Sequence, residues 1–335
     1  MGNCAFITGG LGLIGSVISR KLLDDNIVEN VVCLDHYGRY ISSIRGDFTD
    51  YRKYRLDGIE DRVIIERGEA KYPLLMSRLL AKHQPRFIFH LAALPLAKLD
   101  NLNSAEAIEG SVLSTTNIIE ACSTLKETIG YTPERFVYAS SSMVYGDFQC
   151  NPADEKHQTR PKEIYGTMKL AGEVITRGLG GFYGIPYTII RPSAVFGPTD
   201  MNRRVSQIFL EKAIAGDKIS VHGKDESLDF TYVEDTAKGF VLAATKEAGA
   251  GEVFNITHGK AHTLLEYVLE LRKYFPDLEY EVIERDTFRP KRGTLSIDKA
   301  RRLLGYEPAF SLADGVRKQV EFAKKNHPVL AGSGL

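Results

Sequence analysis

The feature that most restricts the fold of this chain is a glycine-rich turn between its first apolar run and its first amphipathic run. Cys4–Thr8 has the apolar character of a strand, and Ile14–Asp24 has the periodicity of a helix. Between them, Gly9, Gly12 and Gly15 are spaced three residues apart. Glycines at this spacing let a strand turn sharply into a helix that packs against it, which predicts a β-α unit of a parallel sheet.

The alternation of short apolar runs with longer helical patterns continues over the first half of the chain. Nearly apolar strands that alternate with helices are typical of a parallel sheet covered on both faces. We therefore predict an α/β fold with a Rossmann-type, doubly wound parallel sheet, whose ligands bind at the carboxyl ends of the strands. Further strands are predicted at Val31–Asp35, Val63–Arg67, Phe87–Leu91, Phe136–Ser140 and Tyr187–Arg191, and helices at Ser104–Lys126 and Tyr165–Gly178.

The rhythm of the sequence changes after Arg191 and Pro192, where Gly-Pro and Gly-Asp turns follow. No glycine-, serine- or proline-rich linker separates the two parts, so we expect the second part to pack directly on the first. Its helices are predicted near Ser206–Ala215, Leu264–Tyr274, Ile297–Leu304 and Leu312–Lys325.

Composition argues against several classes of partner. Lys plus Arg equals Asp plus Glu at 43 each, whereas nucleic-acid binders carry a basic excess or stripe. No run approaches the ~18 apolar residues of a membrane span, and the N-terminus lacks the pattern of a signal peptide. We therefore expect a cytoplasmic protein that binds neither nucleic acid nor membrane. No metal site is expected either, because the cysteines lack CxxC spacing: Cys4, Cys33, Cys122 and Cys150.

The glycine-rich turn and Asp35 together predict a site for NAD. Gly9 permits the turn, Gly12 lets a pyrophosphate approach the backbone, and Gly15 lets helix and strand pack closely. Asp35 ends the second predicted strand, 20 residues after Gly15. A carboxylate there binds the ribose hydroxyls of NAD and repels the 2′-phosphate of NADP, although a lone Asp at a strand end could equally be a turn residue.

A tyrosine and a lysine four residues apart predict an acid–base pair on one helix face. Tyr165 has the ordinary phenol pKa of about 10, and the ammonium of Lys169 is expected to lower it. Such a pair can take the proton of a hydroxyl as hydride leaves the carbon. Ser141, at the end of the preceding predicted strand, can hydrogen-bond the same oxygen. Each pattern alone arises often by chance.

Taken in order, these motifs resemble those of the extended short-chain dehydrogenase/reductase family, in its NAD-dependent sugar epimerase/dehydratase branch, which includes UDP-glucose 4-epimerase-like enzymes. The resemblance covers nearly the whole chain. It rests on TGGLGLIG (8–15), Asp35, Gly68-Glu69, HLAA (90–93), SSSMVYG (140–146), YGTMK (165–169), RPSAVFGP (191–198), DFTYVED (229–235) and RPKRG…DKARRLLGYEP (289–308).

The resemblance implies a cofactor site, a catalytic trio and a division into domains. Residues 1–190 would form the NAD-binding domain, with 223–256 returning to it, and residues 191–222 and 257–335 a smaller α/β substrate-binding region. Ser141, Tyr165 and Lys169 would be catalytic. The NAD site would comprise Gly9, Gly12, Leu13, Ile14, Gly15, Asp35, Glu69, Leu91, Ala92, Ala93, Ser140, Tyr165, Lys169, Pro192 and Ser193.

Departures from the family pattern narrow the predicted reaction. Family dehydratases carry Asp-Glu directly after the catalytic Ser/Thr, where this chain has Ser142 and Met143, so loss of water is disfavoured. We predict a C4 epimerase of a nucleotide sugar that works through a transient keto intermediate. The alternatives are a nucleotide-sugar dehydrogenase or 4-keto reductase with the same residues, and, more remotely, a non-catalytic NAD(H)-binding regulator. The substrate is expected to contact Ser141, Ser142, Met143, Tyr165 and Arg289.

Two arginine positions and the quaternary structure complete the expectations. The family's frequent diphosphate-binding Arg is replaced by Leu228, and a frequent Asn by Ala194, which leaves Arg289, and more weakly Arg203 and Arg204, as phosphate contacts. The other arginines near Arg289 are interpreted as a solvated face, and Tyr37–Arg67 receives no interpretation.

We also predict a homodimer that pairs the helices Ser104–Lys126 and Tyr165–Gly178. Apolar residues on the outer sides of these helices would form the contact: Val112, Ile119, Leu170 and Val174. The alternative is that the C-terminal region of the same chain covers these residues.

Overall fold

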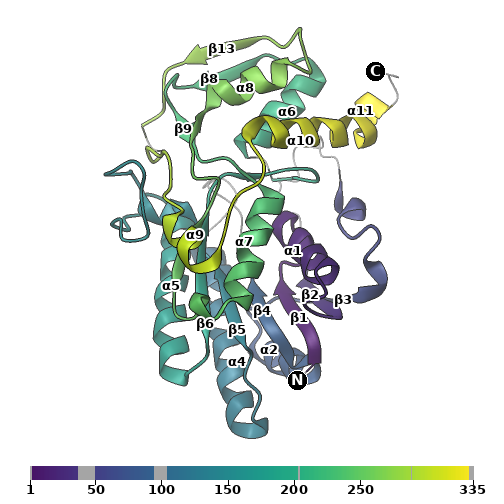
Figure 1. Ribbon diagram of the computed structural model, residues 1–335, viewed down its shortest axis with the longest axis vertical. Helices are drawn as coiled ribbons and strands as arrows, with labels where there is room; N and C mark the ends of the chain where they lie inside the picture. The colour runs from purple at the N-terminus through teal and green to yellow at the C-terminus, as the bar shows by residue number, and fades with distance from the viewer. Residues whose placement is uncertain (1, 37–49, 94–103, 203, 288, 332–335) are drawn as a thin grey trace.

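A seven-stranded parallel sheet forms the base of the molecule (Figure 1), which confirms the predicted fold class. The structure is a computed structural model that describes residues 2–36, 50–93, 104–202, 204–287 and 289–331. The strand order is β11-β6-β5-β4-β1-β2-β3. The strands are β1 (Gly2–Thr8), β2 (Asn30–Asp35), β3 (Val63–Arg67), β4 (Pro85–His90), β5 (Arg135–Ala139), β6 (Tyr187–Pro192) and β11 (Val253–Ile256).

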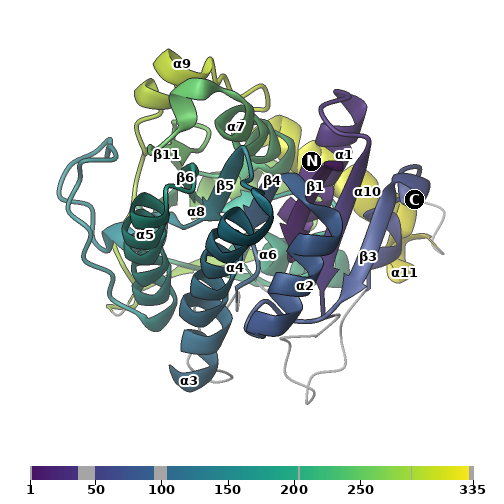
Figure 2. The same cartoon turned by 90° about the horizontal axis from the view of Figure 1, so that it is seen from below.

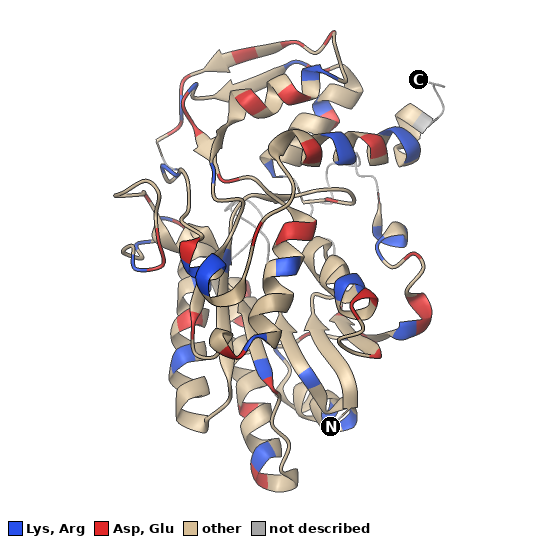
Figure 3. Ribbon diagram, in the orientation of Figure 1, with Lys and Arg blue, Asp and Glu red and all other residues tan. Residues whose placement is uncertain are grey.

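Helices cover both faces of this sheet, which explains why its central strands are mostly apolar. Figure 2 shows α2 (Pro73–His83), α4 (Ser114–Ile129) and α5 (Ile164–Tyr183) along one face. On the other face α1 (Leu13–Asp24) packs against α7 (Val233–Thr245). Figure 3 shows that charged residues lie mainly on the outer helices and loops, and few lie on the central strands.

One predicted helix differs from the observed structure. The prediction at Ser104–Lys126 corresponds to α3 (Ser104–Ala107), a π-helical stretch η4 (Ile108–Leu113) and then α4, which continues to Ile129. Gly130 ends α4 in the left-handed conformation, with φ of 70°, and this favours glycine. The sequence analysis did not identify α2 or α7.

The second region lies above the carboxyl ends of the strands and has a core of its own. That core joins Phe196, Phe230, Tyr267 and Val316, whose side chains are buried. The region contains α6 (Val205–Ala215), α8 (Leu264–Arg272), α10 (Leu312–Asn326), α11 (Pro328–Ala331) and the paired strands β7 (Val195–Phe196) with β10 (Thr231–Tyr232), β8 (Ile219–His222) with β13 (Tyr280–Ile283), and β9 (Ser227–Leu228) with β12 (His262–Thr263). Residues of α9 (Asp298–Leu304), in contrast, belong to the core under the large sheet.

The strand order places a crevice where a ligand can enter. From β1 the chain first adds β2 and β3 on one side and then crosses to β4 on the other. The loops that follow β1 and β4 therefore diverge at their carboxyl ends, which is the usual ligand site of an open α/β sheet. Among the described residues, no helix is long and apolar enough to cross a membrane.

Candidate active site

A large cleft opens between the carboxyl edge of the sheet and the second region, with a volume of about 1490 Å³. Most of the residues predicted to bind cofactor or substrate line it. Ser193 is the exception, because it is buried beside the cleft and does not line it. The predicted residues on its wall are Gly9, Gly12, Leu13, Ile14, Gly15, Asp35, Glu69, Leu91, Ala92, Ala93, Ser140, Ser141, Ser142, Met143, Tyr165, Lys169, Pro192 and Arg289.

The glycine-rich turn has the shape of a phosphate cradle. A Cβ on Gly15 would lie 2.6 Å from the Gly9 carbonyl oxygen, and one on Gly12 would lie 3.0 Å from it, so larger residues do not fit. Gly12 begins α1, and no side chain caps the N-terminus of this helix, whose first turn carries no acid. Its first N–H groups therefore face the cleft with a partial positive charge, as the pyrophosphate of NAD requires.

Acidic residues line the cleft next to the glycine-rich turn. Asp35 ends β2, and one of its carboxylate oxygens accepts the N–H of Leu11 at 3.2 Å. This contact fixes the carboxylate at the rim of the turn, where it can accept hydrogen bonds from the hydroxyls of a ribose. Glu69 forms an ion pair with Lys71 at 3.2 Å, and Lys71 also reaches Glu109 at 3.2 Å. The chemistry of these donors and acceptors fits NAD.

The three predicted catalytic residues meet on another wall of the cleft. Glu163 caps α5 and accepts the N–H groups of Tyr165 at 2.9 Å and of Gly166 at 2.8 Å, which holds Tyr165 in the first helical turn. Lys169 follows one turn later, with its Nζ 5.8 Å from the centre of the Tyr165 ring. Ser141, just beyond β5, lies close enough to Tyr165 to lower the pKa of its hydroxyl.

The electrostatics of Tyr165 differ from the prediction. Burial raises the pKa of Tyr165, and the positive charge of Arg204 and the hydrogen bond with Ser141 oppose that rise. Burial, followed by Arg204, lowers the pKa of Lys169 to about 7, and its ammonium donates to the Ala139 carbonyl at 2.6 Å. The predicted lowering of the Tyr165 pKa is thus wrong for the protein alone, because burial of the phenol outweighs the effects of Arg204 and Ser141 that lower its pKa.

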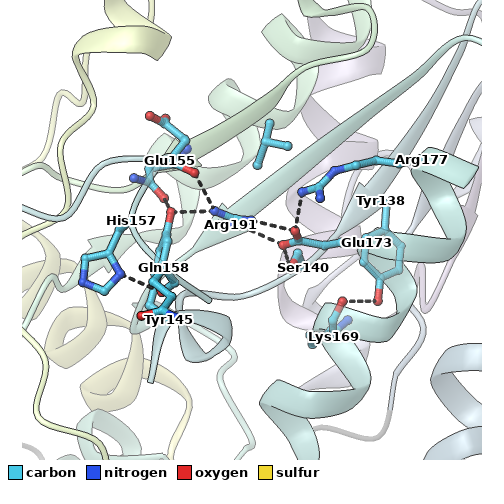
Figure 4. Close-up of polar contacts among 12 residues, drawn as sticks. Tyr138, Ser140, Tyr145, Glu155, His157, Gln158, Lys169, Glu173, Arg177 and Arg191 are labelled. Atoms are coloured by element: carbon cyan, nitrogen blue, oxygen red, sulfur yellow. Dashed lines mark hydrogen bonds and ion pairs between the residues drawn. The ribbon is translucent and has the colours of Figure 1, made fainter. Parts of the chain in front are cut away.

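A buried polar network includes Ser140, which directly precedes Ser141 in the chain (Figure 4). Glu173, which is fully buried, accepts the Ser140 hydroxyl at 2.5 Å and the Arg191 guanidinium at 2.8 and 2.7 Å. Arg177 reaches the same carboxylate from the surface at 2.8 Å. Arg191 in turn donates to the Tyr145 hydroxyl at 3.0 Å. The network fixes the backbone beside Ser141. The sequence analysis missed Glu173, although its place one turn after Lys169 was a usable signal.

Arginines line the wall of the cleft that the second region supplies. Arg204 precedes α6, and its charge acts on both Tyr165 and Lys169. Arg285, Arg289 and Arg292 also reach the cleft, so the prediction of a solvated face is corrected for Arg285 and Arg292, whereas Lys291, Arg301 and Arg302 are exposed. Burial lowers the pKa of Arg292 to about 10, with Glu163 and Glu226 acting in the opposite direction. Arg203, one of the weaker predicted contacts, lies outside the described residues.

Comparisons with known proteins agree with this geometry. Residues 5–257 match the model of the NAD dependent epimerase/dehydratase family, and the chain belongs to this family. It is an enzyme, and NAD is its cofactor.

Individual relatives span nearly the whole chain but differ in reaction. A dTDP-glucose 4,6-dehydratase of Shigella flexneri is 27% identical over 96% of this chain and 92% of its own. The solved UDP-glucose 4-epimerase of Thermotoga maritima with UDP-glucose is 25% identical, with a TM-score of 0.82, and covers 96% of this chain and 99% of its own. A UDP-glucuronic acid 4-epimerase of Bacillus cereus in complex with NAD has the same identity, TM-score and coverage.

Proposed function

We propose that this enzyme is a C4 epimerase of a nucleotide sugar, with a UDP- or dTDP-hexose as substrate. The observation that carries the proposal is the pair Ser142 and Met143, which stand beside the catalytic Ser141 where the dehydratases of the family have Asp-Glu. Ser142 is buried and Met143 is half-buried, and both line the cleft. Neither side chain can serve as the acid or base that removal of water needs.

The acids that do line the cleft are engaged elsewhere, which also disfavours elimination. The one beside Tyr165 is Glu163, and each of its carboxylate oxygens accepts a backbone N–H of α5. Asp35 and Glu69 lie at the cofactor end, where Asp35 accepts the N–H of Leu11 and Glu69 pairs with Lys71. Glu226 pairs with Arg285, and Asp286 pairs with Arg289. Among the described residues of the cleft, no unengaged carboxylate lies ready to protonate a leaving hydroxyl.

In the proposed reaction, Tyr165 accepts the proton of the sugar C4 hydroxyl while Ser141 hydrogen-bonds the same oxygen. When bound, NAD supplies the acceptor and later the donor of hydride, and its positive nicotinamide ring favours the Tyr165 phenolate. Lys169 holds the tyrosine side of the site through its bond to Ala139. Arg204 and Arg292 are placed to hold the diphosphate, so the sugar can turn while its nucleotide stays fixed. Tyr165 returns the proton to the other epimer.

We also propose that the enzyme is a homodimer that pairs α4 and α5, which lie side by side on one outer face (Figure 2). Thr167, Ala171, Val174 and Gly178 follow one another along α5 at helical spacing, and Val174 is 60% exposed. An apolar or small stripe on the outside of a helix supports close packing with a second helix. Ile119 does not contribute, contrary to the prediction, because it is fully buried in the core of the monomer.

A panel of nucleotide sugars, each incubated with the purified enzyme and followed by proton NMR, tests the proposed reaction. The C4 epimer of one sugar should appear with no NAD added and none consumed. Accumulation of NADH in proportion to a 4-keto product would instead identify a dehydrogenase or a 4-keto reductase working in reverse, and a 4-keto-6-deoxy product without NADH would identify a dehydratase.

A further inference from the structure

The connection from β2 to β3 borders the cleft through Arg52 and Arg55. Its described part, residues 50–62, packs on three other parts of the chain. The rings of Tyr51 and Tyr54 lie edge-on to Phe322 of α10, with centroid distances of 5.2 and 5.4 Å. Ile59 is buried in the core below the sheet, and Arg62 donates to the Leu23 carbonyl of α1 at 3.2 Å. Residues 37–49 of the same connection lie outside the described residues.

Arg55 stands in the middle of this segment and joins two distant parts of the backbone. Its Nη1 donates to the carbonyl of Leu11 at 2.6 Å, and its Nη2 donates to the carbonyl of Thr199 at 2.6 Å. Its Nε also reaches the Thr199 hydroxyl at 3.3 Å. The side chain is 7% exposed, so these bonds form away from bulk water and are correspondingly strong. Only the planar fork of an arginine can reach both carbonyls at once.

Both backbone polar groups of Leu11, its N–H and its carbonyl, are therefore hydrogen-bonded to side chains. Its N–H donates to Asp35, and its carbonyl accepts from Arg55. Leu11 sits between Gly10 and Gly12, and glycines give a free chain many backbone conformations. A turn that must present several N–H groups to a phosphate binds more tightly when it is ordered beforehand, because the ordering entropy is then not lost on binding.

The other carbonyl that Arg55 contacts belongs to Thr199, in the turn that precedes Arg204. Thr199 has a φ of 65°, and Asp200 beside it is buried with one carboxylate oxygen that has no hydrogen-bond partner among the described residues. The charges of both Arg204 and Arg55 act on that carboxylate. Arg55 therefore ties the phosphate-binding turn to the segment that carries Arg204.

We propose that Arg55 is a positioning residue for the cofactor. It fixes Leu11, and with it the phosphate-binding turn, in the conformation that accepts the pyrophosphate of NAD. The proposal concerns NAD binding alone and does not depend on which sugar the enzyme epimerises.

Fluorescence titration with NADH tests the proposal on the full chain. Arg55→Gln and Arg55→Lys should each raise the NADH dissociation constant at least tenfold, because neither side chain can bridge two carbonyls. Arg62→Gln is the matched control, since it removes a guanidinium–carbonyl bond of the same segment away from Leu11, and it should change the constant less than twofold. A twofold or smaller change in Arg55→Gln overturns the proposal. So does full recovery in Arg55→Lys, which would mean that positive charge alone is needed.

Hydrogen–deuterium exchange after removal of NAD gives a second test, in the wild-type protein and then in Arg55→Gln. The peptide that covers residues 9–15 should already be protected, as should the one that covers 197–202. In Arg55→Gln, exchange should rise in these two peptides and remain unchanged in α4 and α5. Fast exchange of residues 9–15 in the wild-type protein, or a uniform rise over the whole variant, would overturn the proposal.

Discussion

Glutamine in place of Glu173 removes one negative charge from the buried network that includes Ser140 and keeps the shape of the side chain. The carboxylate accepts four hydrogen bonds, from Ser140, from two nitrogens of Arg191 and from Arg177. A glutamine has one acceptor oxygen, and its amide nitrogen would face a donor of this set. Arg191 would then remain buried, with a side chain 3% exposed, and would have no counter-charge at this site.

The expected loss follows from that burial. Breaking a buried ion pair by neutralising one partner costs about 3–5 kcal/mol of unfolding free energy, because the other charge stays desolvated. The outer partner serves as the control. The Arg177 side chain is 42% exposed, so Arg177→Gln should cost only about 0–1 kcal/mol.

Urea denaturation followed by circular dichroism measures both variants against the wild-type protein. A second variant, Glu173→Gln with Arg191→Met, should be less destabilised than the sum of its two single changes, because it leaves no unpaired buried charge. If Glu173→Gln lowers the free energy of unfolding by less than about 1 kcal/mol, the buried pair does not stabilise the fold. Its proposed role in fixing the backbone beside Ser141 would then be wrong as well.

Four other predictions follow from the site and the surface. Asp35 should make NADP bind about tenfold to a hundredfold more weakly than NAD in calorimetry, a like-charge penalty of about 1–3 kcal/mol; equal binding would contradict its role. Tyr165→Phe should lower turnover at least ~10²-fold and leave bound NAD in place, and a variant with most of its activity would place the base elsewhere. Because the pKa of Lys169 is about 7 against an ordinary 10.5, the unfolded chain binds more protons between these values. The unfolding free energy should therefore rise with pH across that window, and Lys169→Met should lack this contribution in denaturant titrations at pH 7 and 10. Val174→Glu should convert a dimer to monomers in sedimentation, whereas Ala313→Glu on α10 should not; a wild-type species near the 37.3 kDa chain mass would refute the dimer.

The sheet was predictable because its signals are local. Apolar runs such as Val31–Asp35 carry their own periodicity, and the turn at Gly9, Gly12 and Gly15 needs no distant partner to be recognised. The approach of Ser141 to Tyr165 was predictable for a related reason, since Ser141 follows the carboxyl end of β5 and Tyr165 lies in the first turn of α5, the helix that leads to the neighbouring strand β6.

What remained hidden depends on contacts between residues far apart in the chain. Arg55 meets Thr199 across 144 positions, and no local pattern distinguishes it from the surface arginines around it. The pKa of Tyr165 was predicted from Lys169 alone, whereas burial of the phenol raises it and Arg204, from another element, opposes that rise. Ile119 was assigned outward because a single helix pattern does not show how many neighbours cover it.

The fate of the hydrogen at C4 tests the proposed reaction most directly. UDP-glucose that carries deuterium at C4 can be incubated with the enzyme, and its product examined by proton NMR and mass spectrometry. If Tyr165 and Ser141 hold a keto sugar that turns and is reduced again, the deuterium should be found at C4 of the epimer, with none lost to NADH in solution. Deuterium transferred to C6 of a 4-keto product, or released into free NADH, would contradict epimerisation.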